Sequence, residues 1–293
     1  MFDKLLFPTD GSEGATATFD HVLDMAESHD ATVHILNVAD TTRESVTQFR
    51  GQVTDALEQA GARTVQEAAT RASDRNVPTV TDVLQGEPYR TIVDYATTYD
   101  IDLVIMPTHG RRGLERFLLG STTERVVRRS EVPVLTIRPD DDVTVRYPYR
   151  AVLVPTDGSD PANAALGVGV DMATTAAADH HLLSVVDVTS LGVDVRTDIQ
   201  TEVLQESAHE ILDAAEDRAS EAGVDPAATA VEFGGSISRA IRTYVADHDI
   251  DLVVIGTHGR TGFDRYVLGS VTERLVRTAP VPVLTVRTAP TES

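Results

Sequence analysis

The sequence predicts an α/β protein made of two tandem domains, each with a five-stranded parallel sheet. At 293 residues, the chain is longer than one average domain. Its second half repeats the first, and within each half short apolar runs alternate with longer helical patterns. Strands that are buried on both faces and alternate with helices indicate right-handed βαβ crossovers, and therefore a parallel sheet.

The internal repeat defines the domain boundaries. Residues 101–138 align with residues 250–287 without a gap and are identical at most positions, which indicates duplication. Two shorter stretches also recur: "PTDGS" at 8–12 and 155–159, and "VHILNVAD" at 33–40, which matches "HHLLSVVD" at 180–187. We therefore predict domain 1 over residues 1–139, an acidic, proline-bounded linker over residues 140–148, and domain 2 over residues 149–293.

Each half is expected to alternate strands and helices along its whole length. In the first half, the β-branched apolar runs predict strands at Lys4–Phe7, Val33–Val38, Thr79–Leu84, Leu103–Met106 and Val132–Ile137. The helical patterns between them predict helices at Gly14–Ser28, Arg43–Asn76, Tyr89–Tyr99 and Thr122–Arg129. The second half is expected to repeat these elements.

The amino-acid composition limits which partners the protein is expected to bind and the conditions in which it is expected to work. The net charge of −21 combines 46 acidic with 25 basic residues, and Lys4 is the only lysine. An acidic surface with arginine in place of lysine favours a protein adapted to concentrated salt, where self-repulsion is screened; an acidic protein from an ordinary environment is the alternative. Such a surface excludes nucleic acid as the expected partner.

No apolar run is long enough to span a membrane, and the N-terminus lacks the regions of a signal peptide. There are no cysteines, so disulfides and thiolate sites are excluded. We expect a cytoplasmic protein without a membrane partner.

The loop after the fourth strand is a candidate anion site. Ligands of open parallel sheets bind beyond the carboxyl ends of the strands. The second half has "GTHGRTGFDRYVLGSVTE" there, and Ser270 with Glu273 forms the pattern of a capping box, as do Ser121 and Glu124. The free donors and the dipole of a helix N-terminus favour a phosphate, although a capping box also satisfies its own donors. Arginines gather beside both copies of this loop: Arg111, Arg112, Arg116, Arg125, Arg260, Arg265 and Arg274.

The "PTDGS" loop ends the first strand of each half. An Asp-Gly pair after a strand is usually a turn or a helix cap. A carboxylate that faces a phosphate loop also suits ribose hydroxyls or a bridging cation. The residues concerned are Thr9 and Asp10 in the first half, and Thr156 and Asp157 in the second.

Together these motifs resemble those of the universal stress protein family, and specifically its ATP-binding branch. The second half matches the Gly-x2-Gly-x9-Gly-Ser pattern fully, through Gly256, Gly259, Gly269 and Ser270. The first half matches it through Gly110, Gly120 and Ser121, but Pro107 replaces the leading glycine. The resemblance covers nearly the whole chain twice.

The resemblance implies a Rossmann-like fold of the adenine nucleotide alpha hydrolase type, with strand order 3-2-1-4-5 in each domain. It implies that ATP, alone or with Mg²⁺ or Mn²⁺, binds between the "PTDGS" loop and the glycine loop. The adenine contact falls on Val38 and Val185, phosphate contacts include Arg111 and Arg260, and metal contacts fall on Asp10 and Asp157. It also implies an intrachain pseudo-dimer through the fifth strands, and it leaves a homodimer open.

Two functions remain open. One is an ATP-binding stress-response module with little or no turnover; the other is a scaffold of the same fold that acts through protein partners without nucleotide. A P-loop and a dinucleotide fingerprint are both absent from the sequence. His109 and His258 are the strongest enzymatic candidates, but a loop-ordering hydrogen bond is the simpler role, so no catalytic residue is predicted. His180 and His181 are adjacent on a strand and should point to opposite faces, which argues against joint metal binding.

Overall fold

The computed structural model describes residues 2–41, 52–109, 119–139, 145–187, 197–259 and 268–288, with side chains omitted for residues 52–55 and 197–201. The chain divides into two compact units, Met1–Pro148 and Tyr149–Ser293.

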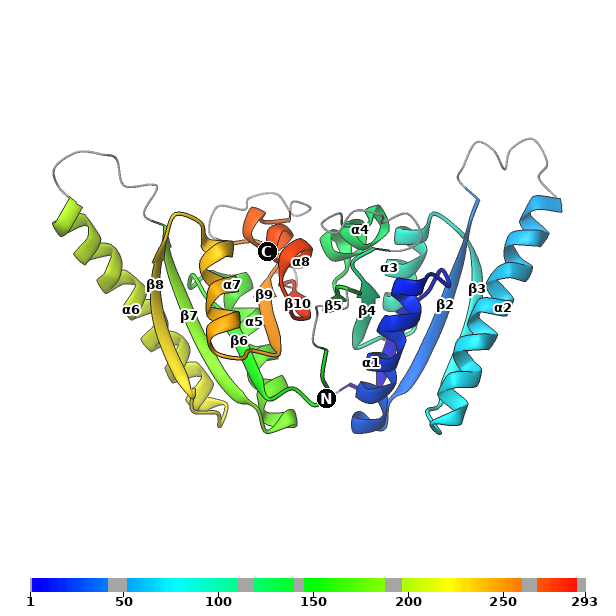
Figure 1. Cartoon of the computed structure of the whole chain (residues 1–293), viewed down its shortest axis with the longest axis horizontal. Helices are drawn as coiled ribbons and strands as arrows, with labels where there is room; N and C mark the ends of the chain where they lie inside the picture. Colours follow the sequence, from blue (N-terminus) through cyan, green and yellow to red (C-terminus); the bar gives the residue numbers. More distant parts are fainter. Residues whose placement is uncertain are drawn as a thin grey trace. The chain divides into compact units, whose positions relative to one another are not determined.

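The first unit alternates strands and helices (Figure 1). Its strands are β1 (Lys4–Pro8), β2 (Thr32–Asp40), β3 (Thr79–Gly86), β4 (Leu103–Pro107) and β5 (Val134–Ile137). Its helices are α1 (Glu13–His29), α2 (Gln52–Asp74), α3 (Pro88–Thr98) and α4 (Ser121–Arg129). These bounds agree with the predicted elements to within a few residues, except that residues 43–51 of the second predicted helix lie outside the described part.

The second unit repeats this order. Its strands are β6 (Ala151–Pro155), β7 (Asp179–Asp187), β8 (Ala228–Gly234), β9 (Leu252–Gly256) and β10 (Val283–Val286). Its helices are α5 (Asp160–Ala176), α6 (Thr197–Glu221), α7 (Ile237–Asp247) and α8 (Ser270–Thr278).

Hydrogen bonding orders the strands as β3-β2-β1-β4-β5 in the first unit and as β8-β7-β6-β9-β10 in the second. The neighbouring strands within each unit are parallel. From β1 the chain crosses first toward β3 and later toward β5. Because crossovers are right-handed, this reversal puts α1 and α2 on one face of the sheet and α3 and α4 on the other.

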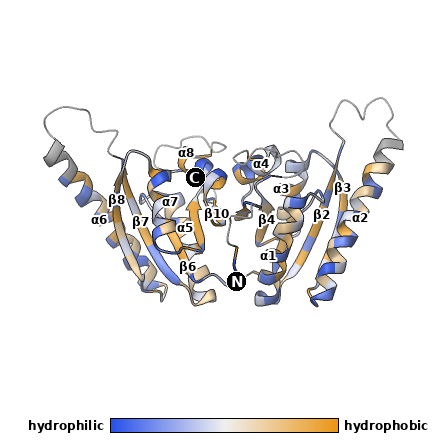
Figure 2. Cartoon of the chain, viewed as in Figure 1, coloured by the Kyte–Doolittle hydropathy of each residue, from blue (hydrophilic) through white to orange (hydrophobic). Residues whose placement is uncertain are grey.

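The central strands form the core of each unit. Every residue of β4, β6 and β9 is buried, as expected for parallel strands covered by helices on both faces. Figure 2 shows β4 and β9 as mostly hydrophobic, whereas α2 and α6 carry many hydrophilic residues. The long helices therefore present polar faces to solvent, as the mixed charge of their sequences indicates.

The two units use complementary residue sizes at one contact between the second strand and the second helix. A Cβ atom added to Gly61 on α2 would lie 2.4 Å from Oδ1 of Asn37. The amide of Asn37 donates to the carbonyl of Thr9 over 2.7 Å, so the end of β2 holds the end of β1. The repeat places the smaller Ser184 and the larger Ala208 at these two positions.

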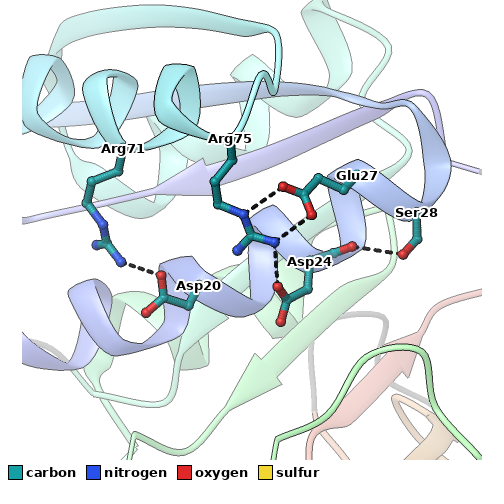
Figure 3. Close-up of polar contacts among 6 residues, drawn as sticks. All are labelled: Asp20, Asp24, Glu27, Ser28, Arg71 and Arg75. Carbon is teal, nitrogen blue, oxygen red and sulfur yellow. Dashed lines mark hydrogen bonds and ion pairs between the residues drawn. The ribbon is translucent and has the colours of Figure 1, made fainter.

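Ion pairs connect α1 with α2 in the first unit (Figure 3). Arg75 reaches Asp24 over 2.7 Å and Glu27 over 2.6 Å, and Arg71 pairs with Asp20. The hydrogen bond from Arg75 holds the pKa of Glu27 below its usual value. Because these groups are partly exposed, the pairs are screened in salt.

Among the helices of the described ranges, none combines the length and the apolar character that crossing a membrane demands.

Two glycines in α5 provide a direct test of its packing. A Cβ atom added to Gly167 would meet no atom within 4 Å, whereas one added to Gly169 would lie 2.4 Å from Cγ2 of Val154. We expect Gly167→Ala to stabilise the chain by roughly 1 kcal/mol through helix propensity. Gly169→Ala should destabilise it by about 1–3 kcal/mol through overpacking. Guanidinium unfolding midpoints measure both effects, and equal stabilisation by the two variants would contradict the packing of α5 on β6.

Candidate functional site

The candidate site lies where the first and fourth strands of a unit separate. β1 pairs with β4 through Leu5–Leu103 and Leu6–Val104, whereas β4 continues to pair with β5 as far as Pro107. The two following loops leave the sheet at the point where the crossovers reverse direction. In α/β sheets this is the place where ligands bind.

The "PTDGS" loop is held by its own side chains. In the first unit, Oγ1 of Thr9 accepts from the N–H of Gly11 over 3.2 Å, and Oδ1 of Asp10 accepts from the N–H of Ser12 over 3.0 Å. Gly11 has a φ of 71°, a conformation that favours glycine. Ser12 then caps α1 by accepting from the N–H of Ala15 over 3.3 Å.

The second unit repeats this arrangement with Thr156, Asp157, Gly158, Ser159 and Ala162. The turn predicted for Asp-Gly is therefore present in both units. Each aspartate also has one carboxylate oxygen engaged within its own loop, which fixes the direction of the side chain.

The loop after the fourth strand is closed at its base in each unit. The N–H of Gly120 donates to the carbonyl of Thr108 over 2.7 Å, and the N–H of Gly269 donates to that of Thr257 over 2.8 Å. A Cβ atom added to Gly269 would lie 3.2 Å from Cα of His258. Glycine at this position therefore permits a close approach between the two ends of the loop.

Two threonines that sequence reasoning missed reinforce this closure. The hydroxyl of Thr123 donates to the carbonyl of Pro107 over 3.0 Å, and that of Thr272 donates to the carbonyl of Gly256 over 2.8 Å. Both tie the first turn of the following helix to the end of the fourth strand. The signal was the threonine that both copies of the motif keep three residues after the last glycine.

The predicted capping box is wrong in both units. Gly120 and Gly269 are the N-cap residues, with extended backbones and no side-chain cap hydrogen bond. Because these glycines are tied to the strand end, the exposed Ser121 and Ser270 already belong to the helix. Each glutamate of the pattern instead pairs with the arginine four residues later: Glu124 with Arg128 over 2.7 Å, and Glu273 with Arg277 over 2.8 Å. The helix starts therefore carry no capping side chain, which preserves their attraction for an anion.

In the second unit, the two loops meet. A Cβ atom added to Gly259 would lie 2.6 Å from Oδ2 of Asp157. One added to Gly256 would lie 2.7 Å from the backbone carbonyl of Pro161, in the first turn of α5. The structure thus brings Asp157, Gly256 and Gly259 together at the carboxyl edge of the sheet.

In the first unit, proline and glycine exchange places between the end of the fourth strand and the first turn of the helix that follows the first strand. Pro107 occupies the position of Gly256, and Gly14 occupies the position of Pro161. A Cβ atom added to Gly14 would lie 2.9 Å from the carbonyl oxygen of His109 and 2.9 Å from Cγ of Pro139. The first turn of this helix and the end of the fourth strand approach each other in both units. The proline lies on the helix in the second unit and on the strand in the first.

The predicted adenine contacts lie near the same edge. Val38 and Val185 are half-buried residues near the ends of β2 and β7. The N–H of Thr156 donates to the carbonyl of Leu183 over 2.8 Å, so the end of β7 lies beside the loop that follows β6. Gly110, Arg111 and Arg260, predicted to contact nucleotide, lie outside the described residues, as do Arg112, Arg116 and Arg265.

Arg125, one of the arginines predicted to serve this loop, contacts α3 instead. Its guanidinium pairs with Glu87 over 2.9 Å and lies 5.0 Å from the ring centroid of Tyr89. The hypothesis that arginines crowd around an anion therefore does not extend to this residue. Arg274, at the corresponding position, is exposed.

The histidines of the loop are bound to their neighbours. Nδ1 of His109 lies 3.2 Å from Oγ1 of Thr108, and Nδ1 of His258 lies 3.1 Å from Oγ1 of Thr257. These contacts are the loop-ordering hydrogen bonds that the sequence favoured.

The prediction for His180 and His181 is confirmed. Nε2 of His180 faces Gly169 on α5, whereas Nδ1 of His181 lies 3.1 Å from the hydroxyl of Tyr244 on α7. Within the described part of the chain, no three histidines or carboxylates are grouped to hold a metal ion.

Comparison with known proteins identifies the family. The model of the universal stress protein family matches residues 1–138 and again residues 148–287. The chain belongs to the universal stress protein family. It therefore carries two tandem universal stress protein domains.

Individual relatives extend this finding. Universal stress protein MJ0531 of Methanocaldococcus jannaschii is 31% identical over 141 residues, which cover 47% of this chain and 83% of that protein. Universal stress protein Rv2005c of Mycobacterium tuberculosis is 30% identical over 219 residues, covering 73% of this chain and 71% of that protein. A crystal structure of a universal stress protein from Archaeoglobus fulgidus shares the fold, with a TM-score of 0.75 at 21% identity over 99% of this chain and 100% of that one.

The helix starts of the second universal stress protein domain provide a test of the capping correction. We expect Ser159→Ala to cost about 1 kcal/mol, because Ser159 caps α5 with its side chain. Ser270→Ala should leave stability nearly unchanged, because Ser270 is an exposed residue inside α8. Thermal unfolding of the two variants measures the difference, and an equal loss in both would restore the capping box at Ser270.

Proposed function

We propose that this universal stress protein binds ATP in its second unit and acts as a regulatory module with little or no turnover. The observation that carries the proposal is the meeting of Asp157 with Gly259 beside the start of α8. A fixed carboxylate, a glycine loop and a helix start without a capping side chain then share one edge of the sheet. This combination suits a ribose and a phosphate chain.

Each group has a definite task in this proposal. The backbone donors of the first turn of α8, together with the glycine loop, would hold the phosphates. Asp157 would accept from ribose hydroxyls or contact a phosphate-bound cation, and Val185 would offer backbone atoms and an apolar side chain to adenine. Mg²⁺ or Mn²⁺ would take most of its ligands from phosphate and water, since Asp157 supplies at most one carboxylate.

The proposal of little or no turnover follows from the surroundings of His258. This histidine is the polar side chain of the loop best suited to proton transfer, and its Nδ1 is engaged with Thr257. We infer that it orders the loop and that the bound state, rather than a reaction, conveys the signal.

One feature of the first unit favours the alternative function, a scaffold that works without nucleotide. The N–H of Thr108 donates to the carbonyl of Ile137 on β5. Because the backbone groups of successive strand residues point to opposite sides, the backbone nitrogen of residue 107 points toward the gap between β4 and β1. Pro107 offers no donor into that gap. If the nucleotide needs this donor, the first unit serves as a nucleotide-free partner of the second.

We further propose pairing of the two fifth strands, a homodimer, residence in the cytoplasm and adaptation to high salt.

Calorimetry at molar salt tests nucleotide binding. The charge of −21 opposes an anion at low salt, whereas at 1 M the Debye length is only about 3 Å. We expect Mg-ATP to bind with measurable heat and to raise the melting temperature, since ligand at about 100 times its Kd stabilises by roughly 2.7 kcal/mol. One nucleotide per chain would locate binding in one unit, and two would show that Pro107 is tolerated. No heat and no thermal shift at molar salt would refute ATP binding.

The Gly259→Ala variant tests where the nucleotide binds. Its Cβ would displace Asp157 or the loop, so we expect ATP affinity in the second unit to fall at least about tenfold. Gly167→Ala, at an open position on α5, is the matched control and should bind like the wild type. An unchanged affinity in a correctly folded Gly259→Ala protein would exclude this loop from the site.

A further inference from the structure

A buried histidine lies beneath α5 in the second unit. The side chain of His180 on β7 is 1% exposed, and its Nε2 lies 3.8 Å from the point where a Cβ of Gly169 would be. Among the described residues, neither ring nitrogen has a hydrogen-bond partner. Burying a polar group without a partner is costly, and burying its charged form costs more.

A buried histidine also lies at the corresponding helix of the first unit. His21 on α1 is 4% exposed, and its ring meets that of Tyr147 edge-on, with centroids 5.8 Å apart. The repeat has Val168 in place of His21 and Val33 in place of His180. Each unit therefore shows that the fold does not need a histidine at the other unit's position.

We propose that α1 and α5, the helices that begin directly after the Asp-Gly-Ser loops, are packed in place through acid-labile histidines and loosen when these are protonated. Two different elements supply the histidine, a helix in one unit and a strand in the other. In both cases it contributes to the packing of the same helix. This inference concerns helix packing and holds whether or not nucleotide binds.

The surroundings of His180 do little to stabilise the protonated form of its ring. Strands β6, β9 and β10, on which α5 also packs, contain no titratable side chain. Among the described side chains, the charged groups of the adjacent helices and of β8 are exposed: Asp160 and Asp171 on α5, Glu202, Glu206, Glu210, Asp213, Glu216, Asp217, Arg218 and Glu221 on α6, and Glu232 on β8. His209 on α6 and Asp179 on β7 are exposed as well, and Asp187 at the far end of β7 is half-buried. Burial, and then the neighbouring His181, lower the pKa of His180 to about 4.

His21 is likewise buried, and Asp24 is a charged neighbour that acts on its pKa. Burial lowers the pKa of His21 to about 4, although Asp24 opposes this shift. Asp24 is itself paired with Arg75 over 2.7 Å. The other titratable groups on α1 and on the described parts of the elements around it are Glu13, Asp20, Glu27 and His29 on α1, Lys4 on β1, His34 and Asp40 on β2, and Glu58, Arg63, Glu67, Arg71 and Asp74 on α2, with Arg75 just after α2 and Arg146 and Tyr147 before the second unit.

The direction of the pH effect follows from these values. Both folded pKa values lie below the ordinary value of 6.5, so the neutral rings contribute their full stability above that pH. This stability is lost as the pH falls from 6.5 toward 4. Between pH 7 and pH 5, each histidine should lower the folding equilibrium constant of its unit about twentyfold.

Hydrogen exchange of the full chain at molar salt tests the proposal. We expect the opening equilibrium constants of α1 and α5, corrected for intrinsic exchange, to rise about twentyfold from pH 7 to pH 5. His180→Val should remove this rise in α5 alone, and His21→Val should remove it in α1 alone. His209→Gln, at an exposed position on α6, is the control and should keep the wild-type response.

Each outcome decides the question. A wild-type response that persists in either valine variant overturns the proposal for that unit. If a valine variant does not fold, a histidine NMR titration of the wild-type chain takes its place. Rings that remain neutral below pH 5.5 while α1 and α5 open support the proposal, and rings that titrate near 6.5 overturn it.

Discussion

The brief pairing between the first and fourth strands governs both candidate sites. After Leu6 and Val104, β1 has no further β4 partner and ends in a loop that Asp10 and Ser12 hold, while β4 remains paired with β5 up to Pro107. Because the crossovers reverse here, helices pack on opposite faces of the sheet on either side of the gap, and the loops that follow the first and fourth strands meet at its carboxyl edge.

The sequence was sufficient for the parts of this arrangement that depend on local pattern. Apolar runs such as 103–106 predict buried strands because both faces of a parallel strand are covered. The repeat strengthens the evidence for each motif, since "PTDGS" at two equivalent positions is a stronger indication than either copy alone. The sequence alone therefore identifies Thr9, Asp10, Thr156 and Asp157 as candidate site residues.

The parts that the sequence could not predict depend on contacts between distant residues. Ser270 and Glu273 have the spacing of a capping box, but the bond from Gly269 to Thr257 makes the glycine the cap. The role of Thr272 depends on a carbonyl sixteen residues earlier, which no local pattern contains. For His180 the sequence only argued against joint metal binding with His181, whereas the structure shows a buried ring with no hydrogen-bond partner among the described residues.

The exchange of proline and glycine between the two units has a consequence for how the duplicated halves can evolve. In the second unit, any side chain at position 256 would meet the carbonyl of Pro161, and in the first, any side chain at position 14 would meet that of His109. Recombination that places a residue with a side chain at position 14 or 256, as copying Pro161 or Pro107 from the other half would, therefore creates a collision. The halves therefore resist being made identical again, so each can keep its own variant of the loop and diverge in what it binds.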